Sequence, residues 1–147
     1  MGKINMGRVL LGGLLAGLVL NIVDYVVYGV VLAGDLEAAM LDLGREPVAA
    51  AQILWFVILD FLYGILLVYL YAAIRPRFGP GARTAVIAGL LVWVGAALLH
   101  SLAEMQMGLF PARFYVIGVV VALISLPVAA VVGAWLYKEG EPTAPAL

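Results

Sequence analysis

Residues 9–33 read VLLGGLLAGLVLNIVDYVVYGVVLA and contain a single charged side chain, Asp24. About 20 apolar residues in a helix are long enough to cross the hydrocarbon core of a bilayer. Three later runs are similarly long and apolar: residues 48–74, 85–103 and 114–137. The sequence therefore predicts an all-α, polytopic transmembrane four-helix bundle that forms one domain over residues 1–138. Residues 139–147 include two prolines and are expected to form a mobile cytoplasmic tail.

The composition supports the same class of protein. Hydrophobic residues make up 66% of the 147-residue chain and charged residues 12%, about half the charged share of an ordinary soluble domain. A chain this short could not bury so much apolar surface in water. The net charge of −1 argues against a nucleic-acid partner, and the absence of cysteine excludes thiol chemistry, disulfides and cysteine-ligated metals.

A short polar segment separates the first two apolar runs. Residues 35–43 read DLEAAMLDL, and their apolar side chains recur at helical spacing with acidic side chains opposite. This pattern predicts a short amphipathic helix that lies at the membrane interface. Gly44 is expected to end that helix, and Pro47 is expected to open the second span at its first helical position.

The distribution of Lys and Arg predicts the orientation of the spans. Six basic residues flank one side of the membrane: Lys3, Arg8, Arg75, Arg77, Arg83 and Lys138. Only Arg45 and Arg113 flank the other side. Because cytoplasmic loops carry the excess of basic residues, both termini are expected to lie in the cytoplasm.

The two halves of the chain share faint sequence repeats. The AGL at residues 16–18 recurs 72 residues later at 88–90, and the YLY at 69–71 recurs 66 residues later as the WLY at 135–137. Such repeats are typical of tandem duplication, which would make the fold two helical hairpins in the same orientation. Apolar sequence also repeats by chance, so four unrelated helices are the alternative.

Each span carries one face of small or polar residues at helical steps. Small residues let helix backbones approach closely in lipid, so these faces are expected to meet in the centre of the bundle. In the first two spans the faces consist of Gly13, Gly17, Asn21, Asp24 and Tyr28, and of Gln52, Phe56, Asp60, Gly64 and Tyr71. In the last two they consist of Gly89, Trp93, Ala97, His100 and Glu104, and of Gly118, Ala122, Ser125, Ala129 and Gly133.

The acidic and basic side chains within the spans are Asp24, Asp60 and His100, with Glu104 at the rim of the third span. An unpaired carboxylate in the bilayer costs about 3 kcal/mol, so each is expected to face the interior with a partner. From the helical rise of about 1.5 Å per residue, the two aspartates lie deeper than the other two residues. The sequence thus predicts a polar, ligand-binding funnel that opens outward. Its expected members are Asn21, Asp24, Tyr28, Asp60, Tyr63, His100 and Glu104.

Two interpretations of the four ionisable residues stay open. His100 and Glu104 lie one helical turn apart and, together with Asp24 and Asp60, could ligate one divalent cation. Alternatively, the two aspartates form a hydrogen-bonded clamp between helices, while His100 and Glu104 lie at the interface near water. We favour the clamp, because metal sites in helical bundles usually use a Glu-x-x-His pattern on two helices and this chain has one histidine.

The sequence contains no motif of an intramembrane protease or of another enzyme, so an enzymatic activity is not expected. The leading hypothesis is a non-enzymatic bundle that binds a small ligand or a partner through the polar funnel, as a homo-oligomer in the lipid bilayer. The alternative is a small transporter or channel subunit coupled to cations or protons, in which Asp24 and Asp60 titrate.

Four segments resemble a group of small bacterial four-span membrane proteins without an assigned activity. They are AGLVLNIVD at residues 16–24, DLEAAMLDLG at 35–44, YAAIRPRFGPG at 71–81 and MGLFPAR at 107–113. In the resembling proteins an acidic residue, often Glu, occupies the place of Asp24. The resemblance implies a four-helix fold in the bacterial cytoplasmic membrane, and it implies no particular activity.

Overall fold

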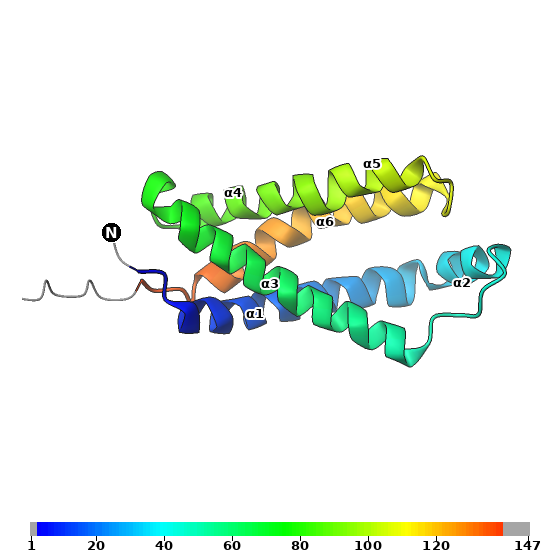
Figure 1. Cartoon of the computed structure of the whole chain (residues 1–147), viewed down its shortest axis with the longest axis horizontal. Helices are drawn as coiled ribbons and strands as arrows, with labels where there is room; N and C mark the ends of the chain where they lie inside the picture. The colour runs from blue at the N-terminus through cyan, green and yellow to red at the C-terminus, as the bar shows by residue number, and fades with distance from the viewer. Residues whose placement is uncertain (1–2, 140–147) are drawn as a thin grey trace, which may run out of the picture.

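The computed structural model describes residues 3–139 and contains helices, turns and loops, with no strand in that range. In chain order the helices are α1 (Met6–Val26), η1 (Val27–Val31), α2 (Ala33–Asp42), α3 (Ala50–Phe78), α4 (Ala82–Val92), η2 (Trp93–Leu99), α5 (His100–Met105) and α6 (Ala112–Ala134) (Figure 1). The segments η1 and η2 are π-helical, so their backbone hydrogen bonds span five residues instead of four.

Four continuous helical stretches are long and apolar enough to cross a membrane. They are Met6–Val31, Ala50–Phe78, Ala82–Met105 and Ala112–Ala134. The predicted all-α, four-helix transmembrane architecture is therefore confirmed. The predicted mobile tail lies outside the described residues except for Glu139.

The helix bounds differ from the predicted spans at two places. The second span does not open at Pro47, because α3 begins at Ala50, where the side chain of Gln52 accepts a hydrogen bond from the backbone N–H of Ala49 at 2.7 Å. The same helix continues through Pro76 to Phe78, beyond the predicted end at residue 74. Only two helical residues follow the proline, so a kink there displaces little of the helix.

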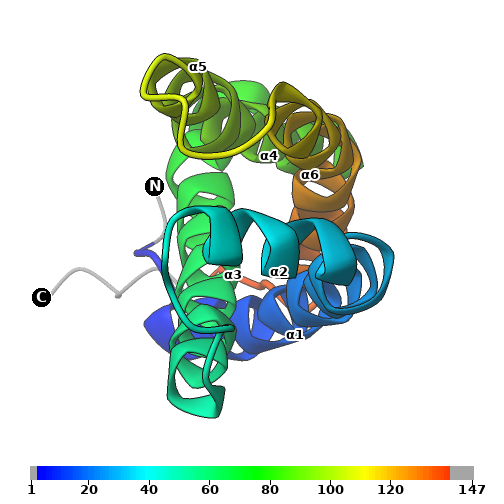
Figure 2. The same ribbon diagram turned by 90° about the vertical axis from the view of Figure 1, so that its right-hand side faces the viewer.

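The α2 helix and the glycine that follows it agree with the sequence prediction. The amphipathic pattern forms α2 as predicted, and Gly44 follows it with a φ of +67°, a left-handed conformation that glycine adopts without strain. Seen along the long axis, α2 turns across one end of the bundle instead of continuing along it (Figure 2).

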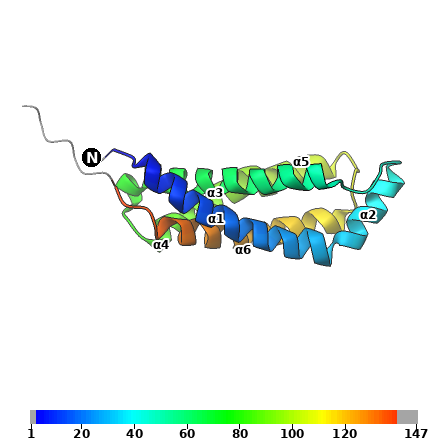
Figure 3. The ribbon, with the colours of Figure 1, turned by 90° about the horizontal axis from the view of Figure 1, so that it is seen from below.

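The two ends of the bundle are unlike each other. One end, which we call the terminal end, holds the first described residues, the turn between α3 and α4 and the last turn of α6 (Figures 1 and 3). The other end, which we call the α2 end, holds α2 and the loop between α5 and α6 (Figure 3).

The buried apolar core lies in the half of the bundle nearer the terminal end. Val9, Leu67 and Val68 are fully buried there, with small residues from α4 and α6 packed beside them. The first turns of α3, at the α2 end, are exposed instead. The prediction that Phe56 faces the interior is therefore wrong, since this side chain is 60% exposed. The helices thus pack tightly at one end and separate toward the other.

Glycines mark the closest approaches of the helices. A methyl group at Gly17 of α1 would lie 2.7 Å from the Cα atom of Phe61 on α3, and one at Gly89 of α4 would lie 2.5 Å from the Cα atom of Pro127 on α6. The two glycines are 72 residues apart and their two partners 66 residues apart, which are the spacings of the sequence repeats. Each hairpin thus contains the same close contact, and this favours tandem duplication over chance.

Candidate binding cavity

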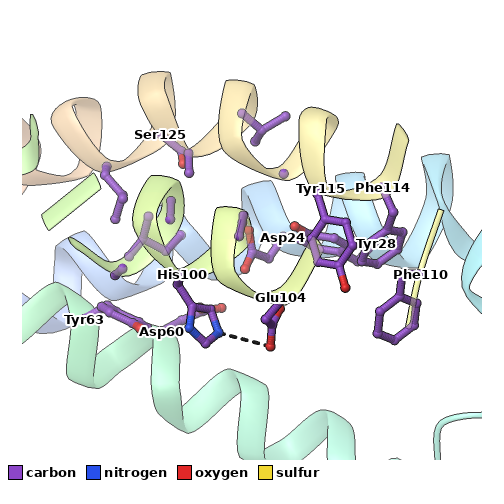
Figure 4. Close-up of a pocket in the computed structure, with 18 residues that line it drawn as sticks. Asp24, Tyr28, Asp60, Tyr63, His100, Glu104, Phe110, Phe114, Tyr115 and Ser125 are labelled. Atoms are coloured by element: carbon purple, nitrogen blue, oxygen red, sulfur yellow. Dashed lines mark ion pairs between the residues drawn. The ribbon is translucent and has the colours of Figure 1, made fainter. Parts of the chain in front are cut away.

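A cavity of about 300 Å³ lies between the two helical hairpins, in the half of the bundle nearer the α2 end. It is lined from α1, η1 and α3 on one side and from η2, α5 and α6 on the other. Its polar and aromatic lining residues are Asp24, Tyr28, Asp60, Tyr63, His100, Ser101, Glu104, Phe110, Phe114, Tyr115 and Ser125 (Figure 4). The structure therefore brings six of the seven residues of the predicted polar funnel to one cavity.

Asp24 and Asp60 meet across the boundary between α1 and α3. The close packing at Gly17 brings α1 beside the turn of α3 that carries Asp60, because a methyl group at Gly17 would lie 3.1 Å from the Asp60 carbonyl oxygen. The two carboxyl groups then approach within hydrogen-bonding range.

Asn21 is the member of the predicted cluster that does not line the cavity. Its side-chain N–H groups donate to the carbonyl oxygen of Gly17 at 2.9 Å and to that of Val57 on α3 at 3.3 Å. Asn21 therefore joins the backbones of α1 and α3, one turn before Asp24 in α1 and opposite the residue one turn before Asp60 in α3, and it holds the two helices together.

His100 and Glu104 form a second pair at the opening of the cavity. The Nε2 atom of His100 lies 3.2 Å from an Oε1 atom of Glu104, one turn further along α5. The side chains are 63% and 41% exposed, so both are accessible from outside the bundle. Figure 4 shows this pair on the α5 side of the opening, with α3 on the opposite side.

The four candidate metal ligands do not converge on one point. Within residues 3–139, no group of three His, Asp or Glu side chains is close enough together to hold a metal ion. The predicted site of four ligands is therefore not assembled, because His100 and Glu104 are adjacent on α5 while Asp24 and Asp60 pair between α1 and α3. The arrangement corresponds to two separate pairs.

Tyr115 is a cavity residue that the sequence analysis missed. It is only 5% exposed, and its hydroxyl group has no hydrogen-bond partner among the described residues. Figure 4 shows this side chain directed from α6 into the cavity region. A signal was present in the sequence, because Tyr115 extends by one turn the predicted face of Gly118, Ala122 and Ser125.

Aromatic rings cluster next to the Tyr115 ring in the lining of the cavity. The ring centroids of Phe110 and Phe114 are 5.2 Å apart in a stacked arrangement, and those of Phe110 and Tyr115 are 6.2 Å apart, edge to face. The ring of Tyr28 lies 5.5 Å from that of Phe114. Gly118 makes room for Tyr28, since a methyl group at this glycine would lie 2.7 Å from the tyrosine hydroxyl.

The two π-helical segments flank the cavity. Tyr28 belongs to η1, while Ala96 and Ala97 of η2 line the opposite wall. Trp93 begins η2 and donates its indole N–H to the carbonyl oxygen of Val119 on α6 at 2.9 Å. Each π-helical segment shifts the side chains that follow it around the helix axis, and such segments occur frequently at functional sites.

Comparison with protein-family models, with curated protein sequences and with solved structures gives no match.

Proposed function

We propose that this protein is a non-enzymatic integral membrane protein that binds a small ligand in the cavity at the α2 end. The four apolar helices support residence in a membrane. The basic residues Arg75, Arg77 and Arg83 lie at the terminal end, which favours a cytoplasmic position for that end and an outward opening for the cavity. By this proposal the membrane is the bacterial cytoplasmic membrane.

The observation that carries the proposal is the Tyr115 hydroxyl. A buried polar group without a hydrogen-bond partner costs about 1–3 kcal/mol. Here the group belongs to a residue that lines the same cavity as the Asp24 and Asp60 carboxyls. A ligand that supplies the missing partner would offset the cost, whereas a structural clamp made of the two aspartates would not need Tyr115 to be polar.

A ligand-panel experiment tests the proposal. The purified full chain in dodecyl maltoside micelles is offered ammonium, carboxylate and phosphate groups, each as a small ion and on a dodecyl chain. A ligand at about 100 times its Kd stabilises the folded state by about 2.7 kcal/mol, which raises the thermal unfolding midpoint. We expect at least one class to do so.

Two matched variants assign such an effect to the cavity. Gly118→Leu adds a side chain to the lining next to Tyr28, whereas Gly95→Leu adds the same side chain at a glycine where no described atom lies within 4 Å of the added Cβ. Stabilisation should disappear in Gly118→Leu and persist in Gly95→Leu. The proposal is wrong if no class stabilises the protein, or if Gly118→Leu responds as the unaltered chain does.

The two carboxyl groups of Asp24 and Asp60, which line one cavity, favour a second candidate, which is transport coupled to protons or cations. Carboxyl groups that face a cavity within a span can exchange a proton for another cation. A path across the membrane would also have to pass Val9, Leu67 and Val68, which are fully buried in the core at the terminal end. The closed core therefore favours binding over transport.

Proton flux distinguishes the two candidates. The chain is reconstituted into liposomes that contain a pH-sensitive dye, and an inward proton gradient is imposed. Binding alone predicts the same slow leak for the unaltered chain and for Asp60→Asn. A faster flux that Asp60→Asn abolishes would establish the transport candidate. The expected homo-oligomer stays a prediction, which the mass of the protein in micelles measures.

A further inference from the structure

We propose that the cavity binds the ammonium head group of an alkylamine, which reaches it sideways from the outer leaflet through the gap between α3 and α5. The inference rests on the proposed function, because it names the class of ligand and the route by which that ligand arrives.

The charges of the lining select a cation. Asp24, Asp60 and Glu104 contribute three carboxyl groups to the cavity, and no Lys or Arg lines it. Glu104 is paired with His100, so the acid pair is the part of the lining without a basic partner. An ionised carboxylate of this pair has no counter-charge in the lining, and a buried charge without a counter-charge is costly. A monovalent cation balances it, whereas an anion would add a second negative charge.

The aromatic residues select an organic cation over a metal ion. Tyr28, Phe110 and Phe114 form a contiguous group of rings in the lining, and ring faces attract ammonium groups. A metal ion would need three or more ligands in close array, and among the described side chains no such group exists. An ammonium group has N–H donors, which suit the carboxylate and the oxygen of the Tyr115 hydroxyl.

The packing of α3 leaves a gap toward the lipid. This helix packs against α1, α4 and α6, but in the described chain it makes no comparable contact with η2 or α5. Tyr63 on α3 and His100 on α5 are both exposed and both line the cavity. Figure 4 shows these two side chains at the opening between the two helices. Polar side chains at a lateral opening suit the charged end of a molecule that lies in the leaflet.

The cavity has room for the ammonium head group together with several waters, since a group of about the volume of one water (~30 Å³) fills only part of it. Small-molecule sites span about 300–1,000 Å³, and this cavity, at about 300 Å³, lies at the lower limit. An ammonium group fits that volume, and an alkyl chain can stay in the gap against the exposed apolar side chains Leu59 and Leu62 of α3. The apolar chain should therefore add affinity that a water-soluble amine lacks.

The test measures binding of dodecylammonium, methylammonium and dodecanoate to the full chain in dodecyl maltoside micelles, by the shift in unfolding midpoint and by titration. Dodecylammonium should bind about ten-fold or more tightly than methylammonium, because the chain buries apolar surface. Dodecanoate should give no shift. Tyr115→Phe, which keeps the ring and removes the hydroxyl, should weaken dodecylammonium binding by about five-fold.

The outcomes separate this inference from the proposed function. Equal affinity for the two amines would overturn the sideways route, and an unchanged affinity of Tyr115→Phe would overturn the assigned contact. Stabilisation by dodecanoate that Gly118→Leu abolishes would overturn the ammonium class and leave the binding function standing. No stabilisation by any probe of the wider panel would overturn both.

Discussion

Adding one methyl group at Gly64 of α3 tests the packing between α1 and α3. At Gly64 its carbon would overlap the backbone of Gly13 and Gly17, and neither backbone can move without separating the two helices. We expect Gly64→Ala to lower the free energy of unfolding by about 2–3 kcal/mol, since overpacking forces backbone shifts. Denaturation with sodium dodecyl sulfate measures the change. Gly95→Ala is the control and should show no loss, because no described atom lies within 4 Å of the added carbon.

Replacing Asn21 distinguishes a role in helix association from a role in ligand binding. Replacing it with Ala removes the hydrogen bond to the Val57 carbonyl, which should lower the free energy of unfolding by about 1 kcal/mol. The affinity for any ligand of the cavity should change by less than about two-fold, since Asn21 does not line it. A variant with unaltered stability and lost binding would show that Asn21 belongs to the site.

Part of the site could be predicted from the sequence, because polar side chains are rare within membrane spans. Asp24, Asp60 and His100 are conspicuous in apolar sequence, because the membrane tolerates them only where they face a partner or a cavity. Tyr115 is not conspicuous, since tyrosines near helix ends are common in the aromatic belts of membrane proteins. The aspartates pair across two helices, and the sequence contains no signal for the distance from that pair to His100.

Among the helices, α2 is the one held least firmly by its neighbours. It packs mainly against η1, and its ion pair to α6, between Asp35 and Arg113 at 3.5 Å, is largely exposed. An exposed ion pair contributes about 0–1 kcal/mol, which is too little to hold a helix in place.

We therefore expect the backbone amides of α2 to exchange hydrogen faster than those of the buried part of α1. Mass spectrometry of the protein in micelles, after short exposure to deuterium oxide, measures the difference. The amides of residues 12–20 serve as the internal reference because their glycines pack against neighbouring helices. Equal protection of α2 and this reference would show that α2 is held by contacts other than those described.

The helices themselves were predictable because lipid requires every backbone hydrogen bond to be satisfied within the span. Length and hydropathy alone therefore locate four spans. The π-helical segments η1 and η2 were not predictable, because inserting one residue into a helical turn leaves the apolar composition unchanged. The exposure of Phe56 also escaped prediction, since it depends on how far α3 separates from α5 at the α2 end.

In the whole molecule, the terminal end is expected to face the cytoplasm and the α2 end the outside. The chain has no cysteine, so single cysteines can be placed without background. Glu46→Cys lies in the exposed loop after α2, and Pro80→Cys in the exposed turn between α3 and α4. In intact cells a membrane-impermeant maleimide should label the first variant and leave the second unlabelled until the membrane is opened. The reverse pattern would place the cavity on the cytoplasmic side.

Carboxyl groups from α1 and α3 meet in one cavity, and a double-mutant cycle measures the coupling between them. The free energy of unfolding is measured for Asp24→Ala, Asp60→Ala and the double variant, with Asp24→Ala combined with Asp42→Ala as a distant control pair. We predict that the double variant loses about 1 kcal/mol less stability than the sum of its single variants, because each single change leaves the other carboxyl without its partner. The control pair should be additive. Additivity within about 0.5 kcal/mol for Asp24 and Asp60 as well would contradict the account.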